Sequence, residues 1–289
     1  MLKTKLHKAG FIFTSFMLMA AASGSRKVTV TAGPAEIIKP AISRDSVVVH
    51  AFDTTGLCTC LPELNAEEKE NAPRIKPHLL AQHFMKVHLE ENGLYYEKIK
   101  TKNAPVLQLI DEVFAKYQLP LELKYLAVVE SKLDNRIVSG AGAAGLWQFM
   151  PQAGRSFGLK ILKNTDDRKN NYKSTVAAAK CLTYLHQQFG DWLLTLAAYN
   201  TGPAKILTAI KKAGSRDYWT IQRYLPAETR KHVLKFISVH YFFEGHGSLV
   251  TMSLAETNAH TKSVDEFLFS TSKLIPAIDS LQQGDAAGN

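Results

Sequence analysis

The sequence predicts an all-α domain that begins near residue 77 and ends near residue 244. Apolar residues recur through this region at the helical intervals of three and four, and alternating strand patterns are nearly absent from it. Glycine or proline punctuates the successive apolar segments. The chain has 289 residues, of which 46% are hydrophobic and 21% charged. This length and composition suit a globular protein with a sizeable core.

The expected helices follow one another with short connections. The first stops before the pair Asn92-Gly93, Gly202 closes one of the later ones, and Pro203 suits the first turn of the next. A loop rich in glycine and alanine, residues 139–145, interrupts the series. Helices are expected over residues 79–87, 106–117, 121–131, 151–157, 175–189, 192–199, 203–213 and 227–243.

The segments outside this domain differ from it in composition. Residues 1–22 combine three early lysines with a short apolar run that ends in small residues, which is the pattern of a secretory signal peptide. A membrane anchor is the alternative, but the run is short for a bilayer span. Residues 23–76 keep no helical period and are expected to form an irregular extension or linker. Residues 245–289 are expected to form a partly helical tail that breaks at Pro276.

The charge pattern narrows the classes of partner. The formal net charge is +9 and the isoelectric point is near 9.3, which favours anionic partners. The basic residues are scattered, and zinc-finger spacing, an aromatic RNA-binding signature and an arginine tract are all missing, so nucleic acid is not an expected partner. The histidines do not have metal-ligand spacing, so neither a metal nor another cofactor is expected. The sequence leaves the oligomeric state open.

Glu130 has the most unusual setting of any charged residue. It follows the apolar residues 126–129 at the end of an expected helix. Apolar surroundings favour the protonated form of a carboxylic acid, and such an acid can donate a proton to a glycosidic oxygen. The alternative is an ordinary helix-end carboxylate balanced by Lys132, and the local pattern alone favours that alternative.

Two further segments carry groups that suit a sugar ligand. The loop of residues 139–145 would allow a close approach of backbone to ligand. It leads into Trp147, which can stack on a sugar face, and Gln148, which can bond to hydroxyl or acetamide groups. Tyr199 and Asn200 place an aromatic ring and an amide at the end of another helix. Taken singly these signals are weak, because an aromatic residue at helical spacing is more often part of the core.

Together, these segments resemble the lytic transglycosylase family, whose domain is related to goose-type lysozyme. The resemblance covers about residues 119–243 and is greatest to the branch of membrane-bound lytic transglycosylase D. The motifs that carry it are Glu130-Ser131, Gly145-Leu146-Trp147-Gln148, Asp167-Arg168, Ala198-Tyr199-Asn200-Thr201-Gly202 and Leu225-Pro226-Ala227-Glu228-Thr229-Arg230.

The resemblance implies a lysozyme-like helical fold with a glycan-binding groove, and peptidoglycan glycan strands as the partner. It implies that Glu130 is the single catalytic acid and base. Glu130 would protonate the oxygen between N-acetylmuramic acid and N-acetylglucosamine, and the C6 hydroxyl of the muramic sugar would attack its own C1, leaving a 1,6-anhydro end without hydrolysis. The substrate-binding residues that it implies are Ser131, Trp147, Gln148, Tyr199, Asn200 and Glu228. With the signal peptide, this predicts an exported enzyme of the periplasm or cell envelope.

Two other functions stay open. A hydrolytic muramidase on the same fold would need a second carboxylate to activate water, and Glu228 and Asp134 are the candidates. A catalytically silent glycan-binding protein of the cell envelope would be expected to lack Glu130. The sequence also departs from the family at His232, where tyrosine is usual and where a histidine's charge would vary with pH. No cysteine follows the apolar N-terminal run, so lipid attachment is not predicted.

Overall fold

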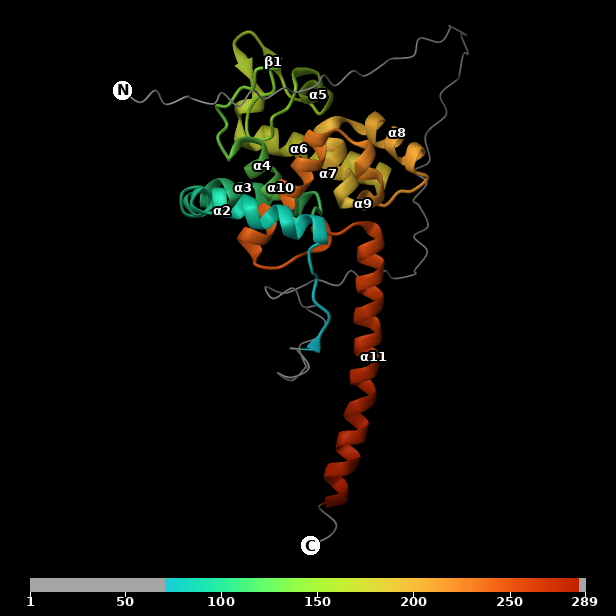
Figure 1. Ribbon diagram of the computed structural model, residues 1–289. Helices are drawn as coiled ribbons and strands as arrows, with labels where there is room; N and C mark the ends of the chain where they lie inside the picture. Colours follow the sequence, from blue (N-terminus) through green and yellow to red (C-terminus); the bar gives the residue numbers. More distant parts are fainter. Residues whose placement is uncertain (1–70, 286–289) are drawn as a thin grey trace, which may run out of the picture.

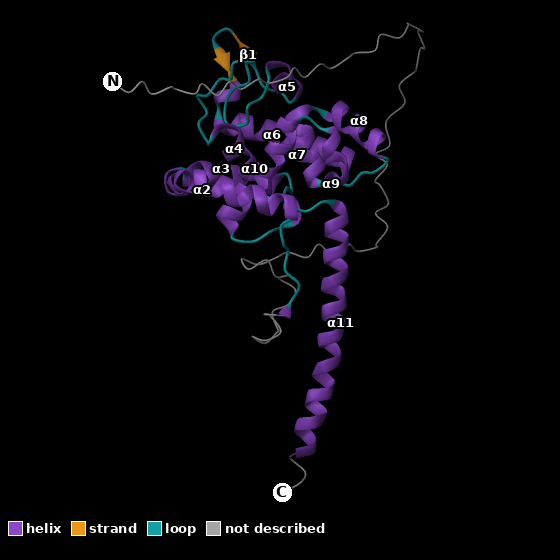
Figure 2. Ribbon diagram, in the orientation of Figure 1, coloured by secondary structure: helices purple, strands orange, loops and turns teal. Residues whose placement is uncertain are grey.

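The computed structural model describes residues 71–285, with side chains for residues 71–270. The predicted signal peptide and most of the predicted N-terminal extension lie outside the described residues. The described chain is mostly helical (Figure 2), and its one sheet is an antiparallel pair, β1 (Ile161–Leu162) and β2 (Thr165–Asp166). The predicted all-α fold class is confirmed.

The elements follow in chain order as Figure 1 labels them. The first part of the domain holds α2 (Leu79–Lys102), α3 (Ala104–Lys116), a 3-10 turn η1 (Leu121–Lys124) and α4 (Tyr125–Ser131). The middle part holds α5 (Pro151–Ser156), η2 (Asp167–Lys169), α6 (Asn171–Phe189), α7 (Trp192–Thr201) and α8 (Pro203–Ala213). The last part holds α9 (Tyr218–Ile221), η3 (Gln222–Tyr224), α10 (Ala227–Glu244), η4 (Leu249–Thr251) and α11 (Leu254–Asp285).

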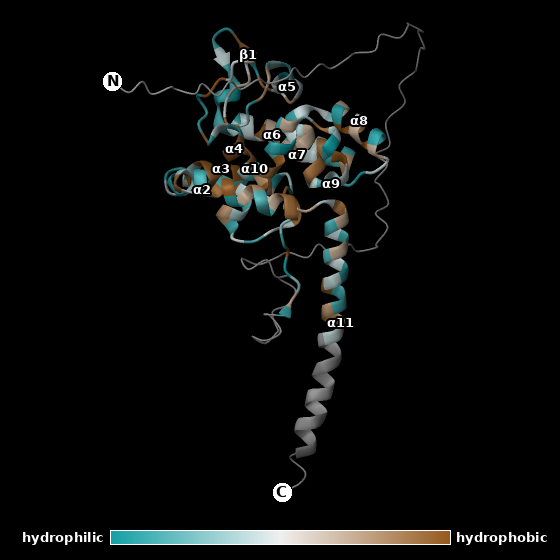
Figure 3. Ribbon diagram, in the orientation of Figure 1, coloured by the Kyte–Doolittle hydropathy of each residue, from teal (hydrophilic) through white to brown (hydrophobic). Residues whose placement is uncertain are grey.

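Helix α7 lies at the centre of the domain. Residues 193–198, six in succession, are all buried. A helix that is buried on every side must be surrounded by other elements, and α6, α8 and α10 all pack against α7. Helix α3 covers α6, while α2 and α4 pack on α10. Apolar side chains from these helices form one continuous core. Figure 3 colours the ribbon by the hydropathy of each residue, and hydrophobic residues (brown) are frequent in α3, α4 and α10.

Helix α2 is longer than the sequence pattern predicts. It continues through Asn92 and Gly93 to Lys102, whereas the apolar pattern stops before this pair. The extra turns bury Tyr96 and Ile99, and the Tyr96 ring packs on that of Phe242 in α10. Glycine in a helix costs about 1 kcal/mol relative to alanine. Burial of two large side chains outweighs that cost, so tertiary packing extends the helix.

Helix α11 projects away from the other helices (Figure 1). Its start is tied to the domain, because Leu254 N–H donates to Asp191 Oδ2 at 2.6 Å and Trp219 Nε1–H donates to Glu256 Oε2 at 2.7 Å. The helix runs through Pro276, so the expected break there is wrong. A proline removes one backbone hydrogen bond and can kink a helix without ending it. Over residues 71–285, no helix is both long and apolar enough to cross a membrane.

Candidate active site

A pocket of about 390 Å³ opens between the end of α4, the loop that leads into α5, and helices α5, α6 and α7. Its volume is in the range of small-ligand sites. Most of its wall is apolar or aromatic, and Glu130 is the one carboxylate among the described residues that line it. The lining residues are Glu130, Gln148, Phe149, Met150, Gln152, Ala153, Ser156, Phe157, Cys181, Tyr184, Leu185, Ala198, Tyr199, Asn200, Thr201 and Pro203.

The backbone at the end of α4 places Glu130 in this wall. Lys132 and Leu133 both adopt left-handed conformations, with φ of 56° and 60°. Such residues reverse the chain at a helix end, although non-glycine residues rarely adopt them. The turn follows directly after Ser131, so Glu130 lies in the last turn of the helix. Its side chain is only 6% exposed, and what it exposes faces the pocket.

Glu130 is paired with a histidine rather than surrounded by apolar groups alone. His232 Nε2 in α10 lies 2.9 Å from Glu130 Oε1, and the histidine side chain is 8% exposed. Lys132, which would balance the charge of an ordinary helix-end carboxylate, does not contact Glu130. Its Nζ lies over the Tyr95 ring, 4.4 Å from the ring centroid. The setting of Glu130 thus combines the apolar residues that precede it with one polar partner, His232.

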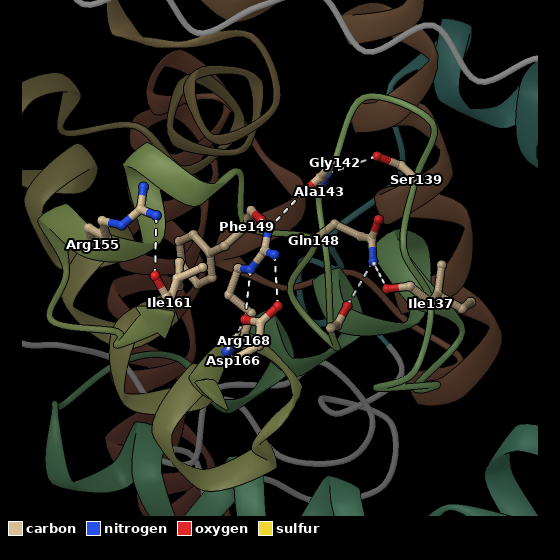
Figure 4. A network of polar contacts seen from close by, with 11 residues as sticks. Ile137, Ser139, Gly142, Ala143, Gln148, Phe149, Arg155, Ile161, Asp166 and Arg168 are labelled. Atoms are coloured by element: carbon tan, nitrogen blue, oxygen red, sulfur yellow. Dashed lines mark hydrogen bonds and ion pairs between the residues drawn. The ribbon is translucent and has the colours of Figure 1, made fainter. Parts of the chain in front are cut away.

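Gln148 lies beside the pocket in a constrained conformation. Its φ is +46°, and its Nε2 donates to the carbonyl oxygens of Gly145 at 2.9 Å and Ile137 at 3.3 Å (Figure 4). These two bonds use the amide hydrogens and hold the side chain in one orientation. The Oε1 atom is then the group of Gln148 that can accept a hydrogen bond from a ligand.

Tyr199 and Asn200 line the pocket from the end of α7. The Tyr199 hydroxyl donates to the Trp147 carbonyl oxygen at 2.8 Å, and burial raises the pKa of this phenol well above its usual range, so it stays neutral. Asn200 Oδ1 accepts from the Thr229 hydroxyl at 2.9 Å, which links α7 to α10. The amide hydrogens of Asn200 take no part in that bond and can donate to a ligand.

Two predicted substrate-binding residues belong to the core instead. Trp147 is 0% exposed, its indole N–H donates to Thr175 Oγ1 at 3.0 Å, and its ring packs on Phe114, so no face is open to a sugar. Ser131 is 1% exposed, and its hydroxyl donates to the Leu146 carbonyl oxygen at 2.8 Å. Neither side chain lines the pocket, so their assignment to substrate binding stays a prediction that these contacts do not support. Both fix the pocket loop from behind.

Arg168 holds the same loop from its other side (Figure 4). Its Nη1 donates to the carbonyl oxygens of Gly142 at 2.6 Å and Phe149 at 3.0 Å, while Nε and Nη2 bind the Asp166 carboxylate. The guanidinium thus joins the middle of the glycine-rich loop, at Gly142, and the segment after it, at Phe149, to Asp166 of the β1–β2 hairpin. In the sequence, Arg168 stands out only as part of the Asp167-Arg168 motif. A motif arginine to which no catalytic role is assigned was the one indication that it holds the loop.

The other two carboxylates considered from the sequence do not line the pocket. Glu228 is exposed in the first turn of α10. Asp134 accepts hydrogen bonds from the Arg136 side chain and backbone, which lower the pKa of this carboxyl to about 2. In the described part of the chain, no cluster of three or more histidine, cysteine, aspartate or glutamate side chains could hold a metal ion.

Known proteins share this region of the chain. Residues 108–222 match the family of the Transglycosylase SLT domain. Membrane-bound lytic murein transglycosylase D of Escherichia coli (strain K12) is 39% identical over 153 residues, which are 51% of this chain and 33% of that protein. A putative tributyltin chloride resistance protein of Alteromonas sp. (strain M-1) is 31% identical over 147 residues, 49% of this chain and 71% of that protein.

The chain belongs to the transglycosylase SLT family. The resemblance read from the sequence motifs is thereby confirmed. The chain spans about a third of the length of the lytic murein transglycosylase D that it matches. Among solved structures, the 70 kDa soluble lytic transglycosylase of Escherichia coli is 25% identical, with a TM-score of 0.43 over 50% of this chain and 26% of that one. In this member of the SLT family, the matched region contains Glu130, Gln148 and the Tyr199-Asn200 pair.

Proposed function

We propose that this protein is an exported lytic transglycosylase, a carbon–oxygen lyase that cleaves the glycan strands of peptidoglycan, with Glu130 as its catalytic acid and base. The observation that carries the proposal is the solitary carboxyl of Glu130 in the wall of a pocket that is otherwise apolar or uncharged. Membership of the SLT family supports it, as does the name of its relative, a lytic murein transglycosylase.

In the first step, Glu130 acts as a general acid. Its carboxyl donates a proton to the oxygen that joins C1 of N-acetylmuramic acid to N-acetylglucosamine. The C1–oxygen bond then breaks, the N-acetylglucosamine hydroxyl leaves, and positive charge develops at C1. A wall of aromatic and aliphatic side chains keeps bulk water from the reacting bond.

In the second step, the same carboxylate acts as a general base. The C6 hydroxyl of the muramic sugar attacks C1, and Glu130 removes the proton from that hydroxyl. The product is a 1,6-anhydro ring, and Glu130 regains the proton that it donated, so no water is consumed. The attacking hydroxyl is tethered to the reacting sugar, which supplies the proximity that a bound nucleophile would otherwise provide.

This scheme requires one carboxyl group where most glycosidases require two. Hydrolysis would need a second carboxylate to activate water. Asp134 is bound to Arg136 and Glu228 is exposed on α10, and neither lines the pocket. The carboxylate distribution therefore favours the transglycosylase over the hydrolytic muramidase.

Two amides in the pocket suit the polar groups of the sugars. We assign Gln148 Oε1 as an acceptor for a hydroxyl or an acetamide N–H, and the Asn200 amide as a donor to an acetamide or hydroxyl oxygen. The uncharged Tyr199 side chain forms part of the pocket wall, and its hydroxyl holds the loop through the Trp147 carbonyl oxygen. We place Glu228 at the outer edge of the groove, where it would contact a bound strand beyond the pocket.

Product analysis tests the proposed reaction. Purified protein is incubated with peptidoglycan sacculi in heavy-oxygen water, and the soluble fragments are analysed by mass spectrometry. Anhydromuramic ends without heavy oxygen are expected, because the attacking oxygen comes from the sugar itself. Reducing ends that carry heavy oxygen at C1 would overturn the proposal in favour of a muramidase.

The Glu130→Gln variant tests the assigned residue. Glutamine keeps the shape of the side chain but cannot donate or accept the catalytic proton, so we expect turnover to fall by at least about a hundredfold. Circular dichroism should show an unchanged helical content. Asp134→Asn serves as a matched control, because it replaces a carboxylate outside the pocket. Unchanged turnover in folded Glu130→Gln, or release of no product by the wild-type protein, contradicts the assignment.

We also propose that residues 1–22 direct export to the periplasm or cell envelope. The lysine-rich start, the short apolar run and the small residues at its end support this destination. The net charge of +9 suits a polyanionic wall. Cell fractionation followed by N-terminal sequencing of the purified protein tests the proposal, and recovery of the chain from the cytoplasm with Met1 intact would contradict it.

A further inference from the structure

The Glu130–His232 pair is the most unusual pair of ionisable groups in the described residues. Both side chains are more than nine-tenths buried, at 6% and 8% exposure, and their Oε1 and Nε2 atoms lie 2.9 Å apart. The two residues are separated by 102 positions in the sequence and come together because α4 packs on α10. One member of the pair lines the pocket, and the other lies behind it.

The surroundings of the second ring nitrogen of His232, Nδ1, indicate which nitrogen of the neutral ring carries the hydrogen. His232 Nδ1 is buried, and no donor or acceptor among the described residues meets it. A buried N–H without a partner is costly, whereas a buried ring nitrogen with only a lone pair is less so. The neutral ring therefore places its hydrogen on Nε2 and donates it to Glu130 Oε1.

We propose that His232 is a positioning residue for Glu130, whose Nε2–H bond to Oε1 holds the carboxyl group in one orientation through both steps of the reaction. The proposal rests on the proposed function for the step that it serves, but the pairing itself can be tested without turnover.

The pairing acts on both steps of the reaction. A hydrogen bond from His232 to Oε1 fixes the plane of the carboxyl group, which leaves Oε2 to give the proton to the glycosidic oxygen. Once that proton has left, the Nε2–H bond stabilises the carboxylate until it accepts the proton of the C6 hydroxyl.

Other ionisable groups interact electrostatically with Glu130 or with the lysines of α10. On α10, Lys231 and Lys235 flank His232 in sequence, and Lys235 interacts electrostatically with Glu130 and Glu228. Burial is the main cause that lowers the pKa of Lys235. The groups from other elements are Lys132 after α4, Tyr199 in α7 and His88 in α2. Among the described residues, none of these six groups has a hydrogen bond to His232, so the direct partner of the imidazole is Glu130.

Two substitutions at His232 test the pair through kcat and KM. His232→Gln places an amide Nε2 where the imidazole Nε2 lies, so it keeps the donor to Glu130. We expect its initial rate on uncross-linked glycan strands to stay within about tenfold of wild type. His232→Leu removes the donor, and we expect kcat to fall about a hundredfold while KM changes little. His83→Gln, a substitution of an exposed histidine on α2, should leave both constants unchanged.

A rate of His232→Gln as low as that of His232→Leu, or a loss in His232→Leu confined to KM, would overturn the proposal. Nuclear magnetic resonance of the ring provides a readout that needs no catalysis. The Nε2–H signal of His232, identified by its loss in His232→Gln, should move upfield in Glu130→Gln, because a neutral amide oxygen is a weaker acceptor than a carboxylate. An unmoved signal overturns the pairing even in an active enzyme, whereas absent activity with a moved signal overturns only the proposed function.

Discussion

Gly145 occupies a position where no side chain fits. A Cβ atom built there would lie 1.8 Å from the Arg168 carbonyl oxygen, and the φ of +83° is unfavourable for any other residue. We expect Gly145→Ala to displace the pocket loop, to lower the free energy of unfolding by more than about 2 kcal/mol, and to reduce turnover at least tenfold. Urea denaturation and the sacculus assay measure the two effects.

Gly142 in the same loop provides the matched control. Its φ is +90°, but a Cβ there would meet no atom within 4 Å. Gly142→Ala therefore carries only the conformational cost of a positive φ, about 1–2 kcal/mol. A loss in Gly145→Ala that is no larger than the loss in Gly142→Ala would contradict the steric argument.

At this site, the sequence motifs predicted the positions of some residues and not of others. The motifs located Glu130, Gln148 and the Tyr199-Asn200 pair in the pocket wall, because these motifs record residues that lie together in the family. They could not tell that Trp147 faces inward, since this depends on the packing of α3 and α6 around it. Nor could they pair His232 with Glu130, because such a contact depends on the packing of α4 and α10.

At the scale of elements, prediction succeeded where local signals were strong. The expected helix at 203–213 coincides with α8, because Pro203 opens it and Gly214 closes it in a left-handed conformation. The expected helix at 227–243 ends one residue before α10 does. The pattern failed for α2, whose second half is stabilised by aromatic contacts with α10 that the local sequence does not reveal.

The cap of α7 joins two elements through one buried carboxylate. Asp191 Oδ1 accepts the Leu194 N–H, and Oδ2 accepts the N–H of Leu254 at the start of α11. Burial raises the pKa of Asp191 to about 6 from its usual 3.8, against the opposing effect of these two hydrogen bonds. A raised pKa means that folding favours the protonated form. The linked stabilisation is therefore complete below pH 3.8 and is lost as the pH rises through about 6.

Asp191→Asn should remove this pH dependence. The amide keeps an acceptor for Leu194 but cannot accept from Leu254, so we expect the variant to be less stable at every pH. The unfolding free energy of wild type should exceed that of the variant by a larger amount at pH 4 than at pH 7.5. The change in this difference between the two pH values should be on the order of 2–3 kcal/mol. Urea denaturation at both pH values measures it, and a difference that does not change with pH would contradict the linkage.

For the whole molecule, the structure bears on where the folding unit ends. The boundary at residue 244 that the sequence suggests leaves out residues that pack in the core. Val250 is 0% exposed, Met252 5% and Val264 3%. The start of α11 also supplies the Asp191 and Trp219 partners. We therefore propose that the catalytic domain extends past residue 244 to at least Val264.

Two truncated chains test this boundary. A chain that ends after residue 270 keeps Val250, Met252 and both contacts of α11, so its Tm and its turnover should match those of the full chain. A chain that ends after residue 244 uncovers the core where Val250 and Met252 pack. Each of these side chains contributes about 1.5–3 kcal/mol through burial, and the Asp191 carboxylate loses its Leu254 partner as well. At about 2–4 °C per kcal/mol for a domain of this size, loss of these two side-chain contributions alone should lower Tm by roughly 6–24 °C, or the chain should fail to fold. Equal Tm values for the two chains, measured by circular dichroism, would mean that the domain ends near residue 244, as the sequence pattern alone suggests.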